Sequence, residues 1–337
     1  MTDAGSEPVA AATTEIVAAD IGGTHARFAI ALVAPGKVLH LGPETVMRAA
    51  DHASLQTAWE AFAEQTGAPL PRAAGIAVAC PVAGEVLKLT NNPWIIRPAM
   101  IPEKLNVDRF TLVNDFEAVA HAVAQAGGGE FRHICGPDQP LPESGVISIV
   151  GPGTGMGVAL VLRRAGTYHV IATEGGHIDF APLDKIEDAI LAHLRKRHNR
   201  VSAERVVSGP GLAAIHEVLA GIEGRAVMGT DDKTLWTAAL SGTDSLATAA
   251  LDRFCLALGS FAGDIALAQG ASATVIAGGV GLRIADHLPA SGFSARYTAK
   301  GRFEGRMGDL PVKLITHPQP GLFGAAAAFA QGLAAKS

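Results

Sequence analysis

Hydrophobic positions along the chain follow two patterns that alternate with each other. Short, largely apolar runs predict strands at residues 74–79, 110–113 and 274–277, and the first of these is expected to be buried. Longer segments, with apolar residues three or four positions apart, predict helices at residues 54–66, 116–126, 185–197, 211–220, 246–268 and 324–333. Because the predicted strands alternate with predicted helices, the sequence indicates an α/β fold.

A glycine turn between two apolar runs lies near the start of the chain, within residues 17–30. Asp20 lies at the end of the first run, and Gly22, Gly23 and Thr24 follow in the turn. Glycines let backbone N–H groups approach an anion closely, because no Cβ stands in the way. A carboxylate beside an anion requires a cation between them, so the turn indicates a site for a metal-bound polyphosphate. An ordinary β-hairpin with a glycine turn fits the same residues.

A second glycine-rich turn lies between the apolar strands predicted within residues 144–162, and it contains Gly153, Thr154 and Gly155. Its spacing does not fit the dinucleotide pattern G-x-G-x-x-G, because Met156 or Val158 occupies the last position. It also lacks the Gly-Lys-Ser/Thr ending of a P-loop. Two glycine hairpins that hold one phosphate chain from opposite sides fit the sequence better.

The two hairpins together resemble the phosphate motifs of the actin, sugar-kinase and heat-shock-chaperone ATPase superfamily. Within it, the chain is similar to bacterial glucokinases of the proteobacterial type, from about residue 16 to the C-terminus. The similarity also rests on the segments LVNDF at 112–116, EGGHIDFAP at 174–182, VSAERVVSGPG at 201–211 and IAGGV at 276–280.

The resemblance implies two ribonuclease-H-like α/β domains with an interdomain cleft, the actin-like ATPase or hexokinase-type fold. We expect a mobile tail at residues 1–14 and a small α/β domain of residues 15–126 plus 317–337. Residues 127–316 would form the large α/β domain. The last helix would then cross back to the first domain. The triple glycine at 127–129 is the candidate boundary, although a surface loop fits it equally.

Asn114 and Asp115 follow an apolar strand and directly precede a helix. Asn and Asp are favoured helix N-caps, whereas the carboxyl ends of strands in open α/β sheets also bind ligands. The residues alone leave both roles open. Transfer of a phosphoryl group to an alcohol needs a carboxylate that accepts the hydroxyl proton. The resemblance implies that Asp115 is this base and that Asn114 and Asp115 bind the sugar.

Glu174 and His177 flank two glycines, which would let both side chains turn into one pocket. Carboxylate and imidazole groups suit the hydroxyls of a sugar. A zinc-ligand pair and a plain surface turn are alternatives, and the former is weak because Cys255 is the only cysteine after Cys135. The resemblance implies that Glu174, His177 and Glu204 bind glucose. Without it, Glu204 is interpreted as a surface charge.

By the same resemblance, Asp20 positions Mg²⁺ directly or through water. The residues that would hold ATP are Asp20, Gly22, Gly23, Thr24, Gly153, Thr154, Gly155, Gly278 and Gly279. The last two follow a strand and either let adenine lie against the backbone or serve a tight strand-to-helix turn. The polar loop at 90–94 offers Asn91 as one more sugar contact.

The resemblance therefore predicts an enzyme that phosphorylates D-glucose to glucose 6-phosphate with ATP and Mg²⁺, at the entry to glycolysis. A kinase for another hexose, such as fructose or mannose, is the nearest alternative. A non-catalytic sugar-sensing protein is another. The intact Asp115 and both phosphate hairpins argue against a sensor, as does the lack of a helix-turn-helix before Asp20.

The amino-acid composition limits the classes of partner and the cellular compartment that we expect for this protein. Of 337 residues, 48% are hydrophobic and 18% charged, which is typical of a well-packed globular protein. A net charge of −5 argues against a broad surface for nucleic acid. Three scattered cysteines favour a reducing cytoplasm. We expect no secretory signal and no membrane span, since no run of eighteen apolar residues occurs. The resemblance also implies that the protein forms a homodimer.

Overall fold

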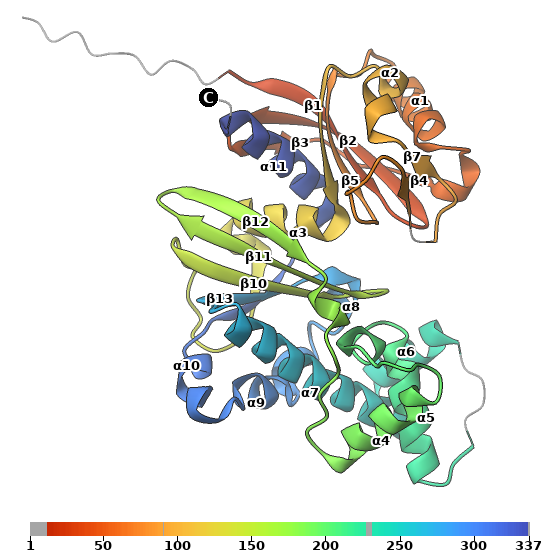
Figure 1. The fold of residues 1–337 in the computed structure, drawn as a ribbon, viewed down its shortest axis with the longest axis vertical. Helices are drawn as coiled ribbons and strands as arrows, with labels where there is room; N and C mark the ends of the chain where they lie inside the picture. Colours follow the sequence, from red (N-terminus) through yellow and green to blue (C-terminus); the bar gives the residue numbers. More distant parts are fainter. Residues whose placement is uncertain (1–11, 90, 227–230, 336–337) are drawn as a thin grey trace, which may run out of the picture. The chain divides into compact units, whose positions relative to one another are not determined.

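The computed structural model describes residues 12–89, 91–226 and 231–335, and the chain divides into two compact units (Figure 1). Unit 1 comprises Met1–Gln125 and Pro318–Ser337, and unit 2 comprises Ala126–His317. Residues 1–11 of the expected tail lie outside the described residues. The first division between the units falls after Gln125, one residue ahead of the triple glycine at 127–129.

Unit 1 is built on a six-stranded sheet. Its strands run in the order β3 (Lys37–Leu41), β2 (His25–Ala34), β1 (Thr14–Ile21), β5 (Ala73–Val78) and β8 (Arg109–Asn114), and β4 (Thr45–Arg48) also pairs with β2. Strands β1 and β2 form an antiparallel hairpin, whereas β1, β5 and β8 are parallel. The register aligns Ile21 with Val78, and Val78 with Asn114. The carboxyl ends of the three parallel strands therefore meet in one row.

Alternate residues of β1 face two different apolar clusters, as the period of a strand requires. Val17, Ala19 and Ile21 pack with α1 (Leu55–Thr66) and α2 (Ile101–Leu105). Ile16 and Ala18 pack instead with α11 (Pro320–Ala334), which shares its face of the sheet with α3 (Asp115–Gln125) (Figure 1).

Small residues let α11 approach its neighbours closely. A Cβ on Gly75 of β5 would overlap the carbonyl of Ala325, and a Cβ on Gly324 would overlap the carbonyl of Ala118 in α3. The alanine-rich sequence of α11 thus serves close packing against both a strand and a helix. The helix starts at Pro320, four residues before the expected start at 324, and proline is well suited to the first helical turn.

Unit 2 repeats the strand arrangement of unit 1. Its sheet has the order β12 (Thr167–Thr173), β11 (Met156–Arg164), β10 (Gly145–Pro152), β13 (Ala273–Ile276), β14 (Val312–Ile315) and β9 (Phe131–Cys135). Strands β10 and β11 form an antiparallel hairpin, and β10, β13 and β14 are parallel. In both units a meander of antiparallel strands thus leads into parallel strands. This repetition confirms the predicted fold class of two ribonuclease-H-like α/β domains.

Helix α7 (Ser245–Ala268) forms the centre of the unit 2 core and packs on α5 (Gly211–Ile222), α6 (Asp232–Ser241) and α9 (Phe293–Thr298). Within the described part of the chain it is the one helix long and apolar enough to cross a membrane. Of its apolar window, 72% is buried inside the protein, which is the behaviour of a core helix. The remaining helices of unit 2 are α4 (Lys185–Arg195), α8 (Gly278–Arg283) and α10 (Glu304–Gly308).

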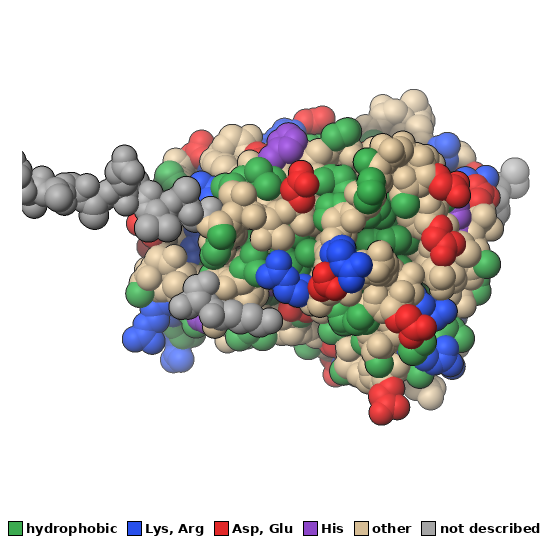
Figure 2. Space-filling model, turned by 90° about the horizontal axis from the view of Figure 1, so that it is seen from above, with side chains coloured by type: hydrophobic (Ala, Val, Ile, Leu, Met, Phe, Trp, Pro, Cys, Tyr) green, Lys and Arg blue, Asp and Glu red, His purple; other side chains and the backbone are tan. Residues whose placement is uncertain are grey.

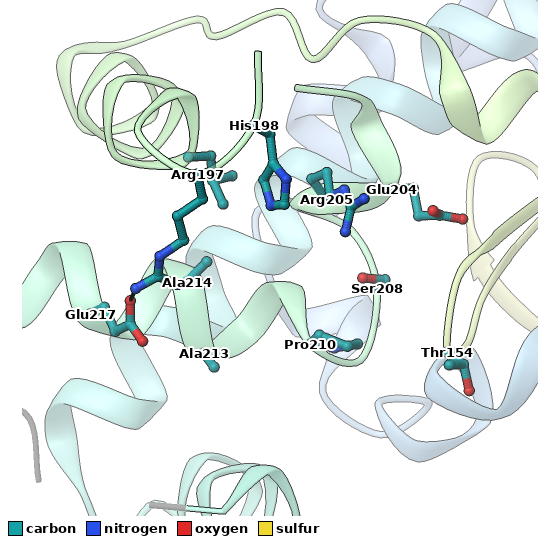
Figure 3. Close-up of a pocket in the computed structure, with 11 residues that line it drawn as sticks. Thr154, Arg197, His198, Glu204, Arg205, Ser208, Pro210, Ala213, Ala214 and Glu217 are labelled. Atoms are coloured by element: carbon teal, nitrogen blue, oxygen red, sulfur yellow. Dashed lines mark hydrogen bonds and ion pairs between the residues drawn. The ribbon is translucent and has the colours of Figure 1, made fainter. Parts of the chain in front are cut away.

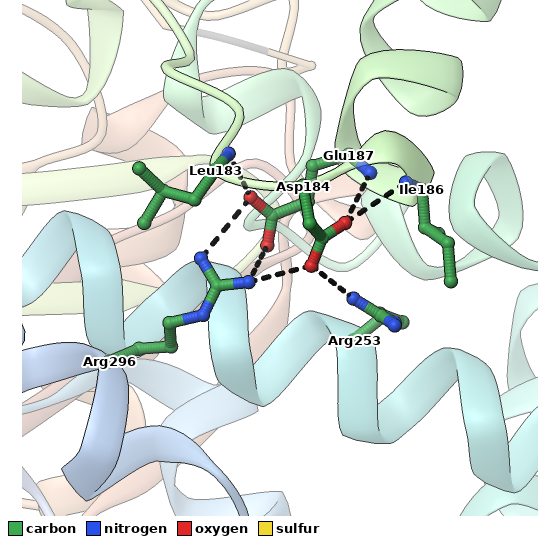
Figure 4. Close-up of polar contacts among 6 residues, drawn as sticks. All are labelled: Leu183, Asp184, Ile186, Glu187, Arg253 and Arg296. Carbon is green, nitrogen blue, oxygen red and sulfur yellow. Dashed lines mark hydrogen bonds and ion pairs between the residues drawn. The ribbon is translucent and has the colours of Figure 1, made fainter.

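A partly buried polar cluster ties α4 to two other helices of unit 2 (Figure 4). Asp184 caps α4 by accepting hydrogen bonds from the N–H groups of Ile186 and Glu187. Its other carboxylate oxygen lies 2.6 Å from Arg253 of α7 and 2.7 Å from Arg296 of α9. One side chain therefore fixes where α4 begins and how it packs. The helix ends at Arg195, two residues before the expected end at 197.

On the face drawn in Figure 2, acidic and basic side chains are interspersed among hydrophobic and other residues. Neither sign of charge dominates that face, in keeping with a net charge of only −5 for the whole chain.

Candidate active site

The row of strand ends in unit 1 carries two neighbouring carboxylates. Asp20 lies one residue before the end of β1, and Asp115 directly follows the last residue of β8. Burial raises the pKa of Asp115 to about 6, and the negative charge of Asp20 adds to the rise. The register of the sheet thus brings together two acids that are far apart in the sequence.

Asn114 and Asp115 also cap α3. The Oδ1 atoms of both residues accept a hydrogen bond from the N–H of Phe116, each at 2.9 Å. The amide of Asn114 in turn donates to the carbonyl of Cys80 at 3.2 Å. Because the cap uses only Oδ1 of Asp115, the second carboxylate oxygen takes no part in it. Capping is therefore compatible with proton transfer at Oδ2.

Asp20 has Arg27 as a basic neighbour. Nη1 of Arg27 lies 3.4 Å from Oδ2 of Asp20, and Nε of Arg27 lies 3.9 Å from Glu44. Burial raises the pKa of Asp20, and Arg27 opposes that rise. Among the described residues no group of three or more His, Cys, Asp or Glu gathers as a metal cluster.

The turn between β1 and β2 is closed by a hydrogen bond from the N–H of Gly22 to the carbonyl of His25, at 2.9 Å. The carbonyl of Gly22 accepts a hydrogen bond from the amide of Asn92 at 3.1 Å. Asn92 is buried, whereas Asn91, the residue expected to contact the sugar, is exposed with φ of 59°. Nothing in the sequence pointed to the role of Asn92 beyond its place in a polar loop near Trp94.

The second glycine turn is shorter than the glycine-rich segment at 151–157 that contains it. Strand β10 continues through Gly151 and Pro152, so that only residues 153–155 form the turn. Gly153 donates to the carbonyl of Gly155 at 2.8 Å, and the N–H of Gly209 donates to the carbonyl of Gly153 at 2.7 Å. A Cβ on Gly153 would meet nothing within 4 Å, which leaves open space above the turn.

Gly278 lies against the same hairpin. It has φ of +79°, and a Cβ there would come within 2.5 Å of the carbonyl oxygen of Pro152. Both features require glycine. Around Gly279, by contrast, a Cβ would meet nothing within 4 Å. The strand-to-helix turn after β13 is thereby held beside the glycine hairpin.

Glu174, His177 and Glu204 lie together in unit 2. Nε2 of His177 is 3.9 Å from a carboxylate oxygen of Glu174, and Nδ1 is 4.0 Å from one of Glu204. Glu174 and His177 are exposed, whereas the side chain of Glu204 is 25% exposed. Donors and acceptors of this kind suit a polyhydroxyl ligand.

The structure requires glycine at the two positions between Glu174 and His177 for a reason other than the expected freedom of the turn. A Cβ on Gly175 would lie 2.9 Å from the side chain of Val158, and one on Gly176 would overlap the carbonyl of Met156. Close approach to β11, more than freedom of the turn, requires them. Met156 was not identified from the sequence, because it appears there as an ordinary apolar residue.

A pocket of about 190 Å³ adjoins this cluster (Figure 3). Thr154 of the hairpin and Glu204 both line it, together with the polar residues Arg197, His198, Arg205 and Ser208. The tip of the glycine hairpin and one candidate sugar ligand therefore border the same cavity.

The predicted site residues fall into two sets, and the structure gathers each set within its own unit. Unit 1 holds Asp20, Gly22, Gly23, Thr24, Asn114 and Asp115. Unit 2 holds Gly153, Thr154, Gly155, Glu174, His177, Glu204, Gly278 and Gly279.

Comparison with known proteins gives one consistent result. A family model described as Glucokinase matches residues 17–332. The chain is 66% identical over 316 residues to the glucokinase of Zymomonas mobilis, covering 94% of this chain and 98% of that protein. It is 41% identical over 323 residues to the glucokinase of Caulobacter vibrioides, covering 94% and 96%. Its fold is similar to the crystal structure of a glucokinase from an Antarctic psychrotroph, with a TM-score of 0.82, 33% identity and coverage of 94% and 98%.

Proposed function

The chain belongs to the glucokinase family, and on this premise we propose that it transfers the γ-phosphoryl group of ATP to the 6-hydroxyl of D-glucose. The products are glucose 6-phosphate and ADP. The family match spans nearly the whole described chain, and curated relatives at 66% and 41% identity are glucokinases. ATP is the phosphoryl donor in this reaction and glucose is the acceptor.

Asp115 acts as the general base. The observation that carries this role is a partly buried carboxylate at the strand ends of unit 1, with its pKa raised to about 6. A base whose pKa lies near the working pH is both ionised and basic enough to accept a proton. As the sugar oxygen bonds to the γ-phosphorus, its proton passes to Asp115. The bond from phosphorus to the bridging oxygen breaks, and ADP leaves with that electron pair.

Asp20 contributes to a site for Mg²⁺. Magnesium in phosphoryl-transfer enzymes is usually bound by one or two carboxylates, with phosphate oxygens and water as the other ligands. Asp20 supplies one carboxylate for this donor set and would hold the cation directly or through water. When bound, the cation would neutralise charge on the phosphates.

The two glycine turns bind the phosphates. The N–H groups of Gly22 and Gly153 close their own turns, so the proposed donors are the backbone N–H groups of residues 23–24 and 154–155. Bare glycines in both turns admit an anion to the backbone. The open space above Gly153 supports this assignment. Gly278 and Gly279 are the proposed neighbours of the adenosine part of ATP.

Glucose is bound by hydroxyl contacts to Asn114, Asp115, Glu174, His177 and Glu204. Support comes from the position of His177 between two carboxylates, since its ring nitrogens lie 3.9 Å from Glu174 and 4.0 Å from Glu204. These groups offer both acceptors and donors, as a ring of sugar hydroxyls requires.

The test of this function is the variant Asp115→Ala, assayed with Mg-ATP by release of ADP. Removal of a positioned base should lower turnover about 10²- to 10⁴-fold. Glu103→Ala, at an exposed carboxylate of α2 in the same unit, is the matched control and should keep full turnover. Wild-type turnover by Asp115→Ala would refute the role. A panel of glucose, fructose and mannose separates a glucokinase from a kinase for another hexose.

We place the enzyme in the cytoplasm as a homodimer. Its cysteines, Cys80, Cys135 and Cys255, are all free thiols in the structure, which supports a reducing compartment. The dimer rests on the family resemblance, and sedimentation equilibrium tests it.

A further inference from the structure

Met156, at the exit of the second glycine hairpin, contacts both candidate sugar segments of unit 2. Its N–H donates a hydrogen bond of 2.9 Å to Oε2 of Glu204. Its carbonyl lies against Gly176, between Glu174 and His177, where a Cβ would overlap it. The residue that ends the phosphate turn is therefore also the support of the sugar ligands.

Gly155 has a matching relation to Glu204. A Cβ built on Gly155 would come within 2.5 Å of Oε2 of Glu204 and 3.3 Å of its Cδ. The φ angle of Gly155 is not positive, so backbone conformation does not require glycine there. The space that its missing side chain leaves is filled by the Glu204 carboxylate (Figure 3 shows Glu204 beside the hairpin that carries Thr154).

These two contacts fix the position of the Glu204 carboxylate. Oε2 is held by the hairpin backbone, and Oε1 lies 4.0 Å from Nδ1 of His177. A hydrogen bond to an ionised carboxylate is stronger than one between neutral groups. The hairpin is itself anchored, since Gly209 donates to the carbonyl of Gly153 at 2.7 Å. Glu204 therefore has little freedom to move without the hairpin.

We propose that Gly155 and the Met156 N–H are positioning residues of the sugar site: they hold Glu204 for glucose, in addition to the hairpin's role with phosphate. The inference rests on the proposed function, because it takes Glu204 as a sugar ligand. It requires that a methyl group on Gly155 weakens glucose binding even when no nucleotide is present.

Gly153 supplies the matched control, because it lies two residues away in the same turn and a Cβ there meets nothing within 4 Å. Isothermal titration with glucose alone should show roughly tenfold weaker binding for Gly155→Ala than for the wild type. Gly153→Ala should bind glucose within about twofold of the wild type. Thermal melting checks that both variants are folded.

A double-mutant cycle tests whether Gly155→Ala weakens glucose binding through Glu204. Glu204→Ala weakens glucose binding by itself, and in that background Gly155→Ala should cause no further loss, since there is no carboxylate left to displace. Wild-type glucose affinity in Gly155→Ala would overturn the inference, as would an equal loss in both backgrounds. Failure of the wild type itself to bind glucose would instead overturn the proposed function, so the two failures are distinguishable.

Discussion

Gly321→Ala tests how Asp20 is held in unit 1. Gly321 is the second residue of α11, and its bare Cα faces the Asp20 carboxylate. A Cβ at this position would lie 2.7 Å from Cγ of Asp20 and 3.2 Å from Oδ1. Helix and strand are both fixed by close packing, so the Asp20 side chain is the group that must give way.

The size of the effect follows from the contact. Ordinary contact with a Cβ begins at 3.4 Å, so Cγ of Asp20 must withdraw by about 0.7 Å, and Oδ2, the atom nearest the added Cβ, by more, unless the side chain rotates. A misplacement of this order in catalytic geometry costs up to roughly 10²-fold. We expect turnover to fall about 10- to 100-fold and the requirement for Mg²⁺ to rise. Stability should hold, because alanine is favoured over glycine in helices by up to about 1 kcal/mol.

The assay is ADP release at saturating glucose and ATP over a series of Mg²⁺ concentrations, together with the melting temperature. Gly332→Ala on the same helix is the control, since the nearest atom to its Cβ is Oγ1 of Thr111 at 3.7 Å, an ordinary contact. Normal turnover and Mg²⁺ requirement in Gly321→Ala would refute the reasoning. An equal loss in Gly332→Ala would assign the effect to α11 as a whole.

Further predictions concern the other proposed roles. With Asp115 titrating at a pKa of about 6, kcat/KM should fall about tenfold per pH unit below 6 and stay level above it, and a rate that is flat down to pH 5 would contradict the base. Because the folded state raises this pKa from 3.8 to about 6, stability falls as the pH rises through this interval, and the full cost of the ionised carboxylate is present above pH 6. Asp115→Asn should therefore raise the melting temperature at pH 7.5 much more than at pH 4, in metal-free buffer. Glu174→Gln and His177→Ala should each weaken glucose binding roughly tenfold and leave ATP binding unchanged, whereas the reverse result in titrations would remove them from the sugar site. Gly153→Val should raise the KM for Mg-ATP, since its side chain would occupy the open space above the turn; an unchanged KM would show that phosphate does not bind there.

Local chemistry made several elements predictable. Helix α1 begins after Ser54, whose side chain accepts from Thr57, and ends at Gly67 in the left-handed conformation, as the sequence indicated. Strands β5, β8 and β13 lie within one residue of the predicted runs at each end. These features depend on residues close together in the chain, so a pattern of apolar positions and caps suffices to find them. The glucokinase family was likewise identified from the motifs alone.

The residues that contact the candidate site residues could be identified only from the tertiary structure. Asp20 lies beside Asp115 because β5 pairs with both β1 and β8 in register, and Gly321 reaches Asp20 because α11 packs across the same sheet. The hydrogen bond from Met156 to Glu204 likewise depends on where β11 and the loop before α5 meet. Local propensity carries no information about such contacts. The sequence by itself determined which chemical groups are present and where the strands and helices form; sheet order and the close packing permitted by small residues decided which of those groups meet.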